Sequence, residues 1–380
     1  MYKRYLNLSN LLKLRSFFLF GPRGTGKSTL IVQTLPDCFK YDLLDSDTFL
    51  ELAKRPKLIG EQAPKDKIIV IDEIQRMPEL LNEVHRLIFN EKRKFLLTGS
   101  SARKLKKKGV NLLAGRAFQC DLFPLTSWEI PSFDLLTYLN TTGLPEFYGQ
   151  PMADEFLKSY IGTYLKEEIR NETQIRNLPA FGRFLEVVAL SNGQEINYAS
   201  ISSDCGIPQR TLEGHFSILN DTLLGFSVCA FLQTKKRKAI TRSKYYLFDI
   251  GVVRFLTLRS KVEFGSELFG HAFEHFIALE LRAYLSYKRS NLILQYWRST
   301  TQFEVDFIIG NQLAIEVKGT NLVQDKHLKG LRSLKEEGLI AHYCIVSTDV
   351  AIRETQDGIK IWPWKDFLTN LWNDKIISLV

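Results

Sequence analysis

Apolar runs without polar alternation recur through the first third of the chain, and helical patterns separate them. Five such runs predict strands, near Phe17–Phe20, Phe39–Leu44, Ile68–Ile71, Phe95–Thr98 and Ala117–Leu122. A strand whose residues are all apolar is typical of a parallel sheet that is buried on both faces. The alternation of strands with helical segments therefore predicts an α/β domain with a mostly parallel sheet over residues 1–134.

The pattern changes after this first domain. Residues 135–190 have a helical pattern with mixed charge, and we expect a helical lid or linker there. Residues 191–260 carry two short helical segments, a basic run and a strand at Lys244–Phe248. Residues 261–380 are expected to form a small α/β domain, with one helix, several strands, a helix and a last strand.

The stretch from Gly21 to Ser28 matches G-x-x-x-x-G-K-[ST] and lies between the first predicted strand and a helical segment. Its glycines allow successive N–H groups to point at phosphate oxygens, and the following helix adds the positive end of its dipole. In such a loop Lys27 reaches the β- and γ-phosphates, and the Ser28 hydroxyl takes one Mg²⁺ position. We predict a nucleotide-binding loop formed by Gly21, Pro22, Arg23, Gly24, Thr25, Gly26, Lys27, Ser28 and Thr29.

Two acids end the third predicted strand, at the sheet edge where α/β proteins bind their ligands. We expect Asp72 to hold Mg²⁺ through water and Glu73 to orient and polarise the attacking water, as in a hydrolase. The alternative is an ordinary acidic helix start. The sequence contains no Asn-Lys-x-Asp guanine-reading motif, so ATP is favoured over GTP.

Two further residues are candidates for the catalytic step. Ser100 follows the fourth predicted strand and could touch the γ-phosphate or the water, although a hydroxyl is also a common turn residue there. Arg116 follows a turn, and it either acts as an arginine finger toward a neighbouring subunit or lies on the surface. The first reading of Arg116 implies a homo-oligomer, either a ring or a dimer.

Composition and charge narrow the class of protein. Of the 380 residues 45% are hydrophobic and 24% charged, as in ordinary globular proteins, and no apolar run is long enough for a transmembrane helix. Five scattered cysteines have no Cys-x-x-Cys spacing and predict neither a disulfide framework nor a zinc site. We expect a cytoplasmic protein without a membrane partner. The net charge of +9 permits nucleic-acid binding without requiring it.

Residues 194–219 have the layout of a helix-turn-helix, with a turn at Gly206 and a second helix that opens at Pro208. The basic run and the strand that follow look like the wing of a winged-helix domain. DNA phosphates would then meet the side chains of Arg210, Lys235, Lys236, Arg237 and Lys238. The alternative is a winged helix that packs against protein and leaves its basic run in solvent.

A second group of chemically active residues lies on two predicted strands near the C-terminus. The period of two in a strand places Glu304 with Asp306 on one face, and likewise Glu316 with Lys318. A short turn between the strands would pair them antiparallel and bring Asp306 close to Glu316, and Glu274 on the preceding helix could complete the cluster. Asp306 and Glu316 are candidates for a Mg²⁺ site, and Lys318 for stabilising charge on a phosphate.

The motifs of the first domain resemble a prokaryotic group of AAA+-type P-loop ATPases. The resemblance rests on Gly21–Ser28, Val70-Ile71-Asp72-Glu73-Ile74-Gln75, Leu97-Thr98-Gly99-Ser100, Leu113-Ala114-Gly115-Arg116, Leu122-Phe123-Pro124-Leu125 and Gly143-Leu144-Pro145-Glu146. It covers most of the chain, and in that group a domain of unknown function usually follows the ATPase. The resemblance implies an AAA+-type fold and ATPase activity.

The C-terminal segment resembles the PD-(D/E)xK nuclease core, which has the order helix, three strands, helix, strand. Asp306, Glu316 and Lys318 match its motif, although no Pro precedes Asp306. The resemblance implies Mg²⁺-dependent cleavage of DNA. The same fold without catalysis, and a chance match on the polar face of a sheet, are the alternatives.

The sequence therefore predicts an ATPase that needs ATP and Mg²⁺ and couples its nucleotide state to a winged-helix and nuclease-like module acting on DNA. One rival is an ATP-driven protein-interaction switch or scaffold whose nuclease-like domain is inactive. Another is a DNA-binding ATPase regulator that cleaves nothing.

Overall fold

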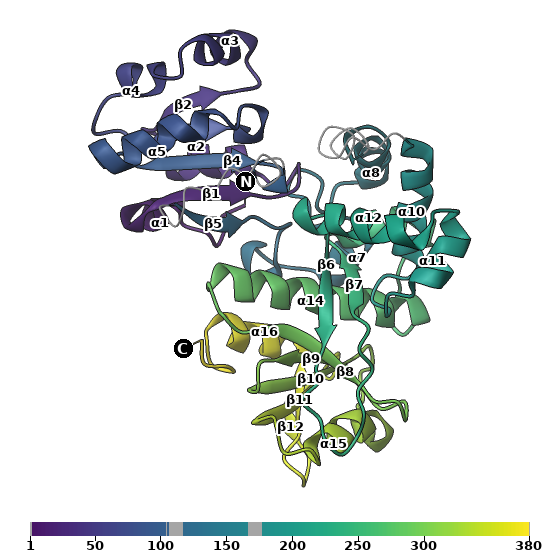
Figure 1. The fold of residues 1–380 in the computed structure, drawn as a ribbon. Helices are drawn as coiled ribbons and strands as arrows, with labels where there is room; N and C mark the ends of the chain where they lie inside the picture. The colour runs from purple at the N-terminus through teal and green to yellow at the C-terminus, as the bar shows by residue number, and fades with distance from the viewer. Residues whose placement is uncertain (1, 104, 106–116, 166–176, 380) are drawn as a thin grey trace.

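The computed structural model of this chain describes residues 2–103, 105, 117–165 and 177–379. An N-terminal α/β domain, a group of helices and a C-terminal α/β unit follow one another along the chain (Figure 1). This mixed α/β architecture is the one expected from the sequence. None of the helices in the described ranges combines the length and the apolar character needed to span a bilayer.

The N-terminal domain is built on a five-stranded parallel sheet of order β2-β3-β4-β1-β5. All five predicted strands are confirmed: β1 (Ser16–Phe20), β2 (Phe39–Asp42), β3 (Ile69–Asp72), β4 (Phe95–Gly99) and β5 (Ala117–Asp121). The helical elements are α1 (Leu8–Leu14), α2 (Lys27–Thr34), α3 (Ser46–Lys54), α4 (Leu58–Gln62), the 3-10 turn η1 (Ile74–Arg76) and α5 (Leu80–Glu91).

Burial on both faces explains why these strands do not alternate. In β1 the side chains of Phe17 and Leu19 enter one hydrophobic cluster, and those of Phe18 and Phe20 enter another. All four are almost fully buried. Because no face of β1 meets water, each position in the strand favours an apolar residue.

Helices connect the two α/β parts of the chain. They are the 3-10 turn η3 (Ser127–Glu129), α7 (Leu135–Asn140), α8 (Ala153–Ser159), the π-helical segment η4 (Tyr160–Leu165), α10 (Leu178–Leu190), α11 (Tyr198–Cys205), α12 (Gln209–Asp221) and α13 (Ile250–Leu256). The pair α11 and α12 lies where the helix-turn-helix was predicted. Gly206 ends α11 at a φ of 70°, a conformation that favours glycine.

The C-terminal unit contains an eight-stranded sheet of order β12-β13-β11-β10-β9-β8-β6-β7. The strands are β6 (Gly225–Ala230), β7 (Lys244–Leu247), β8 (Leu294–Arg298), β9 (Glu304–Ile309), β10 (Leu313–Lys318), β11 (His342–Ser347), β12 (Arg353–Glu354) and β13 (Lys360–Pro363). Its helices are α14 (Glu267–Tyr287), the 3-10 turn η5 (Asp325–Leu328), α15 (Lys329–Lys335) and α16 (Trp364–Trp372).

This sheet differs from the expectation in two respects. Strand β6 pairs antiparallel with β7 and in parallel with β8, so the two strands of the expected wing form one edge of the C-terminal sheet. The sheet therefore crosses the predicted boundary between residues 260 and 261. The structure also adds β12, β13 and α16 after the expected last strand; β12 and β13 are too short to give a periodic signal.

Arg4 joins the N-terminal domain to α14, the helix that lies between the two sheets (Figure 1). Its guanidinium donates to Glu129 Oε1 at 2.9 Å, to the Thr25 carbonyl at 2.6 Å and to the hydroxyl of Tyr287, at the end of α14, at 3.2 Å. One hydrophobic cluster also continues from β1 through α14 into β9 and β10. The two α/β parts therefore share a core.

We predict that Arg4→Met lowers the free energy of unfolding by about 3 kcal/mol, because it leaves the buried Glu129 carboxylate without its cation. The midpoint of denaturant unfolding measures the loss. The neighbouring Lys3 is exposed, so Lys3→Met should change the free energy by less than about 0.5 kcal/mol. Equal effects of the two variants would contradict a structural role for Arg4.

Candidate functional site

The loop from Gly21 to Ser28 joins the end of β1 to the start of α2. Gly24 and Gly26 have φ values of 82° and 88°, in the left-handed region that favours glycine. At Gly21 a Cβ atom would lie 2.4 Å from the Leu122 carbonyl oxygen, so only glycine fits against the chain after β5. The loop thus has the backbone turns that let N–H groups face a phosphate.

The predicted phosphate and metal residues lie together at the start of α2. Lys27 is buried, and its ammonium donates to the carbonyls of Gly21 at 2.6 Å and Pro22 at 3.1 Å. Ser28 follows it, and its hydroxyl lies 3.5 Å from Asp72 Oδ2. Thr29 is exposed on the first turn of α2. The loop and β3 therefore meet at the same edge of the sheet, as expected.

Asp72 ends β3 and is 5% exposed. Its carboxylate accepts a hydrogen bond from the Thr98 hydroxyl and pairs with the Lys40 ammonium at 2.9 Å. Burial alone would raise the pKa of this carboxyl, but the bond from Thr98 and the charge of Lys40 outweigh burial and lower the pKa. Asp72 is therefore held as an anion beside Ser28, which is the form that binds Mg²⁺.

Glu73 and Ser100 are linked by Gln75, a residue without a predicted role. Glu73 has φ 59° and ψ 43°, a left-handed conformation that is uncommon outside glycine. The Gln75 amide nitrogen donates to the Glu73 carboxylate and lies 3.3 Å from Ser100 Oγ. Gly99 makes room for Gln75, since a Cβ there would lie 2.2 Å from Gln75 Oε1. Gln75 thus fixes the distance between the two candidates.

Arg116 lies outside the described residues.

A segment from the helical part of the chain covers the phosphate loop. A side chain at Gly24 would meet Leu144 and Tyr160, and one at Gly26 would meet Pro145. The Tyr160 hydroxyl donates to the Arg23 carbonyl at 3.0 Å. Leu144 and Pro145 belong to the segment Gly143-Leu144-Pro145-Glu146, so this part of the resemblance packs directly on the nucleotide loop.

Asp249, just after β7, anchors this covering segment. It is fully buried, and it accepts from the Thr142 hydroxyl at 2.9 Å, from the Gly143 N–H at 2.7 Å and from the Val252 N–H at 3.0 Å. This contact could not be predicted from the sequence, because Thr142 and Asp249 belong to segments far apart along the chain.

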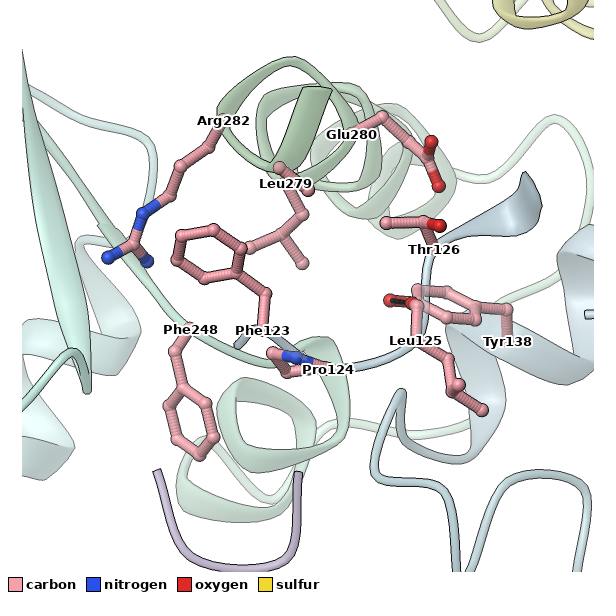
Figure 2. Close-up of a pocket in the computed structure, with 10 residues that line it drawn as sticks. Phe123, Pro124, Leu125, Thr126, Tyr138, Phe248, Leu279, Glu280 and Arg282 are labelled. Carbon is pink, nitrogen blue, oxygen red and sulfur yellow. Dashed lines mark hydrogen bonds between the residues drawn. The ribbon is translucent and has the colours of Figure 1, made fainter. Parts of the chain in front are cut away.

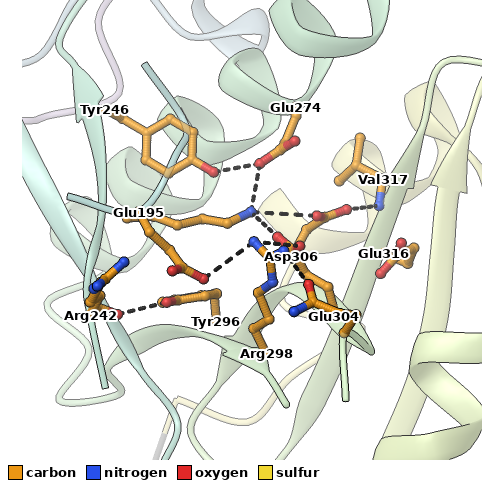
Figure 3. A network of polar contacts seen from close by, with 12 residues as sticks. Glu195, Arg242, Tyr246, Glu274, Tyr296, Arg298, Glu304, Asp306, Glu316 and Val317 are labelled. Carbon is orange, nitrogen blue, oxygen red and sulfur yellow. Dashed lines mark hydrogen bonds and ion pairs between the residues drawn. The ribbon is translucent and has the colours of Figure 1, made fainter. Parts of the chain in front are cut away.

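The four predicted residues of the C-terminal site come from three elements, with Glu274 on α14, Asp306 on β9, and Glu316 and Lys318 on β10. Figure 3 shows Glu274, Asp306 and Glu316. Ile315 pairs with Phe307, so Glu316 and Asp306 follow as close neighbours on the antiparallel strands. The Val317 N–H donates to Asp306 Oδ2 at 2.8 Å, and Lys318 Nζ lies 2.6 Å from Glu316 Oε1.

A residue that the sequence did not place in this site lies at its centre. Lys244, the first residue of β7, has its ammonium 2.7 Å from Glu304 Oε1, 3.2 Å from Glu274 Oε1 and 3.7 Å from Asp306 Oδ1. The Tyr246 hydroxyl donates to the same Glu274 oxygen at 2.6 Å. We call Lys244, Glu274, Glu304, Asp306, Glu316 and Lys318 the acidic cluster.

Burial and neighbouring charges shift the pKa values of residues in this cluster. Burial, followed by the nearby Asp306 carboxylate, raises the pKa of Glu316 to about 8. Burial also raises the pKa of Glu274. Burial alone would lower the pKa of Lys244, but Glu274 and the other carboxylates outweigh it and raise that pKa, so Lys244 is a cation.

The arrangement as it stands does not fit a metal. Within the described ranges, no three His, Cys, Asp or Glu side chains come together as a metal site. Lys244 takes the position at Asp306 Oδ1 that a metal would need. One feature does fit a further cation, because Glu316 Oε2 is buried and has no hydrogen-bond partner among the described residues.

The predicted DNA-contacting residues lie elsewhere. Arg210 is exposed on the first turn of α12. In the basic run after β6, the backbone N–H groups of Lys235, Lys236 and Arg237 all donate to the Glu337 carboxylate at 2.8–2.9 Å, and the Arg237 guanidinium bonds Glu336 at 2.7 Å. The side chains of Lys235, Lys236 and Lys238 are exposed. Part of the run is thus engaged by the protein's own acids.

A small cavity of about 10 Å³ lies between the chain after β5 and helix α14 (Figure 2). The guanidinium carbon of Arg282, one of the lining residues, lies 4.6 Å from the ring centre of Phe123 and 4.4 Å from that of Phe226. Burial lowers the pKa of this guanidinium to about 10. No residue of the phosphate loop or the acidic cluster lines the pocket.

Three family models match the chain in succession. Residues 14–130 match an AAA domain, residues 132–263 a domain of unknown function (DUF8612) and residues 269–367 another domain of unknown function (DUF4143). Each covers less than half of the chain. The AAA match contains the phosphate loop, Asp72, Glu73 and Ser100.

The chain is 24% identical over 363 residues to the uncharacterized protein MJ1544 of Methanocaldococcus jannaschii, a match that covers 83% of this chain and 79% of that protein.

Among solved structures, a Signal Transduction ATPase with Numerous Domains from Pyrococcus horikoshii is 16% identical, with a TM-score of 0.26, over 76% of this chain and 47% of its own. The Thermotoga maritima RuvB Holliday junction branch migration motor is also 16% identical, with a TM-score of 0.29, over 58% of this chain and 88% of its own. Because these TM-scores are low, the assignment rests on the family model and the loop geometry. Residues 14–130 therefore match the AAA domain family and contain the phosphate loop.

Proposed function

We propose that this protein binds and hydrolyses ATP at the edge of the N-terminal sheet and uses its nucleotide state to control the C-terminal unit. The observation that carries the proposal is the meeting of Lys27, Ser28 and Asp72 beside a loop with two left-handed glycines. Residues 142–145 also cover the loop, and Asp249, just after β7 of the second sheet, binds this covering segment. Through this contact a change at the nucleotide would reach the C-terminal unit.

The residues of this site divide the work of ATP hydrolysis. The backbone from Gly21 to Gly26 would surround the phosphates, and Lys27 would leave its carbonyl partners to neutralise the β- and γ-phosphates. Ser28 and Asp72 would hold Mg²⁺, which supplies charge neutralisation at the phosphates when it is bound. Lys40 would then release one Asp72 oxygen.

Glu73 is the proposed general base, because it directly follows Asp72, the proposed Mg²⁺ ligand, at the carboxyl end of β3. Gln75 positions Glu73 relative to Ser100, which would contact the γ-phosphate or the water. Arg116 is the proposed arginine finger in a neighbouring subunit of a ring or dimer.

Metal-dependent cleavage of DNA at the acidic cluster is a second candidate function. The closeness of Asp306, Glu316 and Lys318 favours it, as does the unpartnered Glu316 Oε2 within the described part of the chain. The position of Lys244 opposes it, and favours an ATP-driven switch whose nuclease-like unit is inactive.

We expect Lys27→Ala to weaken ATP binding by at least about 30-fold, because the mutation removes a charge on the phosphates. Glu73→Gln should retain binding and lower kcat by about 10²- to 10⁴-fold, as expected for loss of a general base. Fluorescent-nucleotide titration and phosphate release measure the two effects. The exposed substitutions Lys13→Ala and Glu79→Gln serve as controls. Hydrolysis at wild-type rates in Lys27→Ala or Glu73→Gln would refute this site.

For the second candidate, nicking of a supercoiled plasmid with ATP and either Mg²⁺ or Mn²⁺ should be reduced at least about 100-fold by Asp306→Asn. Asp325→Asn, an exposed change in the same unit, should leave nicking intact. If the wild type and a variant without Lys244 both fail to nick, cleavage is excluded and the switch stands.

A further inference from the structure

The acidic cluster already holds a cation that belongs to the protein. The Lys244 ammonium lies within 3.7 Å of three carboxylates, and only 5% of its side chain is exposed. Its ring contact with Tyr296, at 5.4 Å from the ring centre, encloses it further. A buried ammonium surrounded in this way replaces the hydration that the carboxylates lose on folding.

A divalent metal would compete for the same oxygens. Asp306 Oδ2 is used by the Val317 N–H, so Oδ1, the oxygen that faces Lys244, is the one left for a metal. Glu316 Oε2, buried and unpartnered within the described residues, is the second oxygen such an ion would use. With the ammonium in place, a doubly charged ion beside Asp306 would be repelled at close range.

We propose that Lys244 decides which cation the acidic cluster holds. While its ammonium lies against Asp306 the cluster is closed to divalent metals, and withdrawal of Lys244 opens Asp306 and Glu316 to Mg²⁺ or Mn²⁺. Lys244 is therefore the residue that determines the metal affinity of this unit.

The strand that carries Lys244 is tied to the nucleotide loop. Tyr245, Tyr246, Leu247 and Phe248 are all buried, and Asp249 follows them. Asp249 holds Thr142 and Gly143, whose successors Leu144 and Pro145 cover Gly24 and Gly26. From Lys244 to Asp249 the extended chain spans about 17 Å.

Because a packed strand transmits displacement along its length, a shift of the covering segment would move Lys244. This part of the inference rests on the proposed ATP site: nucleotide binding withdraws Lys244 from the cluster.

Manganese titration of the nucleotide-free protein, followed by the EPR signal of free Mn²⁺, tests the competition. Lys244→Met should bind Mn²⁺ at least about tenfold more tightly than the wild type, because a repelling charge is removed. The added affinity should disappear in Lys244→Met/Asp306→Asn. Lys288→Met removes an ammonium that follows the last residue of α14 and pairs with Asp374; it is the matched control and should bind like the wild type.

If Lys244→Met does not fold, Lys244→Met/Glu304→Gln removes one negative charge together with the positive one and keeps Asp306 and Glu316. The proposal is wrong if the variant that folds gains no Mn²⁺ affinity over the wild type.

Amine labelling of the intact protein, read by mass spectrometry, tests the link. A non-hydrolysable ATP analogue should raise the labelling rate of Lys244 by about fivefold, since the buried ammonium becomes accessible. Thr142→Val, which removes one bond to Asp249, should reduce this increase, whereas the neighbouring Thr141→Val should preserve it.

Nucleotide binding is measured in parallel by fluorescence. If the analogue binds and Lys244 labelling does not change, the link is wrong and the ATP site stands. If no nucleotide binds, the proposed ATP site and the proposed effect of nucleotide on Lys244 are both wrong. The manganese titration alone then tests whether Lys244 excludes metals from the acidic cluster.

Discussion

The parallel pairing of β6 with β8 is the contact on which the second site depends. Cys229 and Ala230 lie opposite Gln295 and Tyr296, and this short pairing adds β6 and β7 to the C-terminal sheet. Without it β7 would belong to the helical part of the chain. With it, Lys244 reaches the carboxylates of β9 and α14, and the helical part shares a strand with the unit that it would control.

Buried carboxylates set a strict electrostatic constraint on that unit. Asp306 and Glu316 are 5% and 6% exposed, and anions at such depth need a cation, a proton or a set of hydrogen-bond donors. The structure uses all three: Lys244 and Lys318 supply charge, the Val317 N–H donates to Asp306, and the pKa of Glu316 rises to about 8. A metal bound by Asp306 and Glu316 would have to replace one of these groups. Val317 and Lys318 lie on β10 together with Glu316, whereas Lys244 lies on a separate strand, β7.

Local patterns were enough to predict the first domain and its candidate site. The five strands and the phosphate loop are contiguous in sequence, and Asp72 and Glu73 follow a strand whose burial on both faces is visible in its composition. Strand period and one turn also placed Asp306 near Glu316. What the sequence could not show is the role of residues whose partners are distant along the chain: Lys244 at the acidic cluster, and Asp249 at Thr142. Gln75 was visible in a motif, but its function depends on the turn at Glu73 that brings it to Ser100.

Two sets of contacts connect the nucleotide loop with the acidic cluster. Arg4 bonds the Thr25 carbonyl and Tyr287, so it holds one end of α14 against the loop, and Glu274 on the same helix is held with it. The second connection runs through the covering segment and Asp249 into β7. The two connections meet where β7 packs on α14. His275 bonds the Leu247 carbonyl there at 2.7 Å, and Lys244 forms its ion pair with Glu274. Lys244 therefore lies at the point where a change in either connection would reach the carboxylates of the acidic cluster.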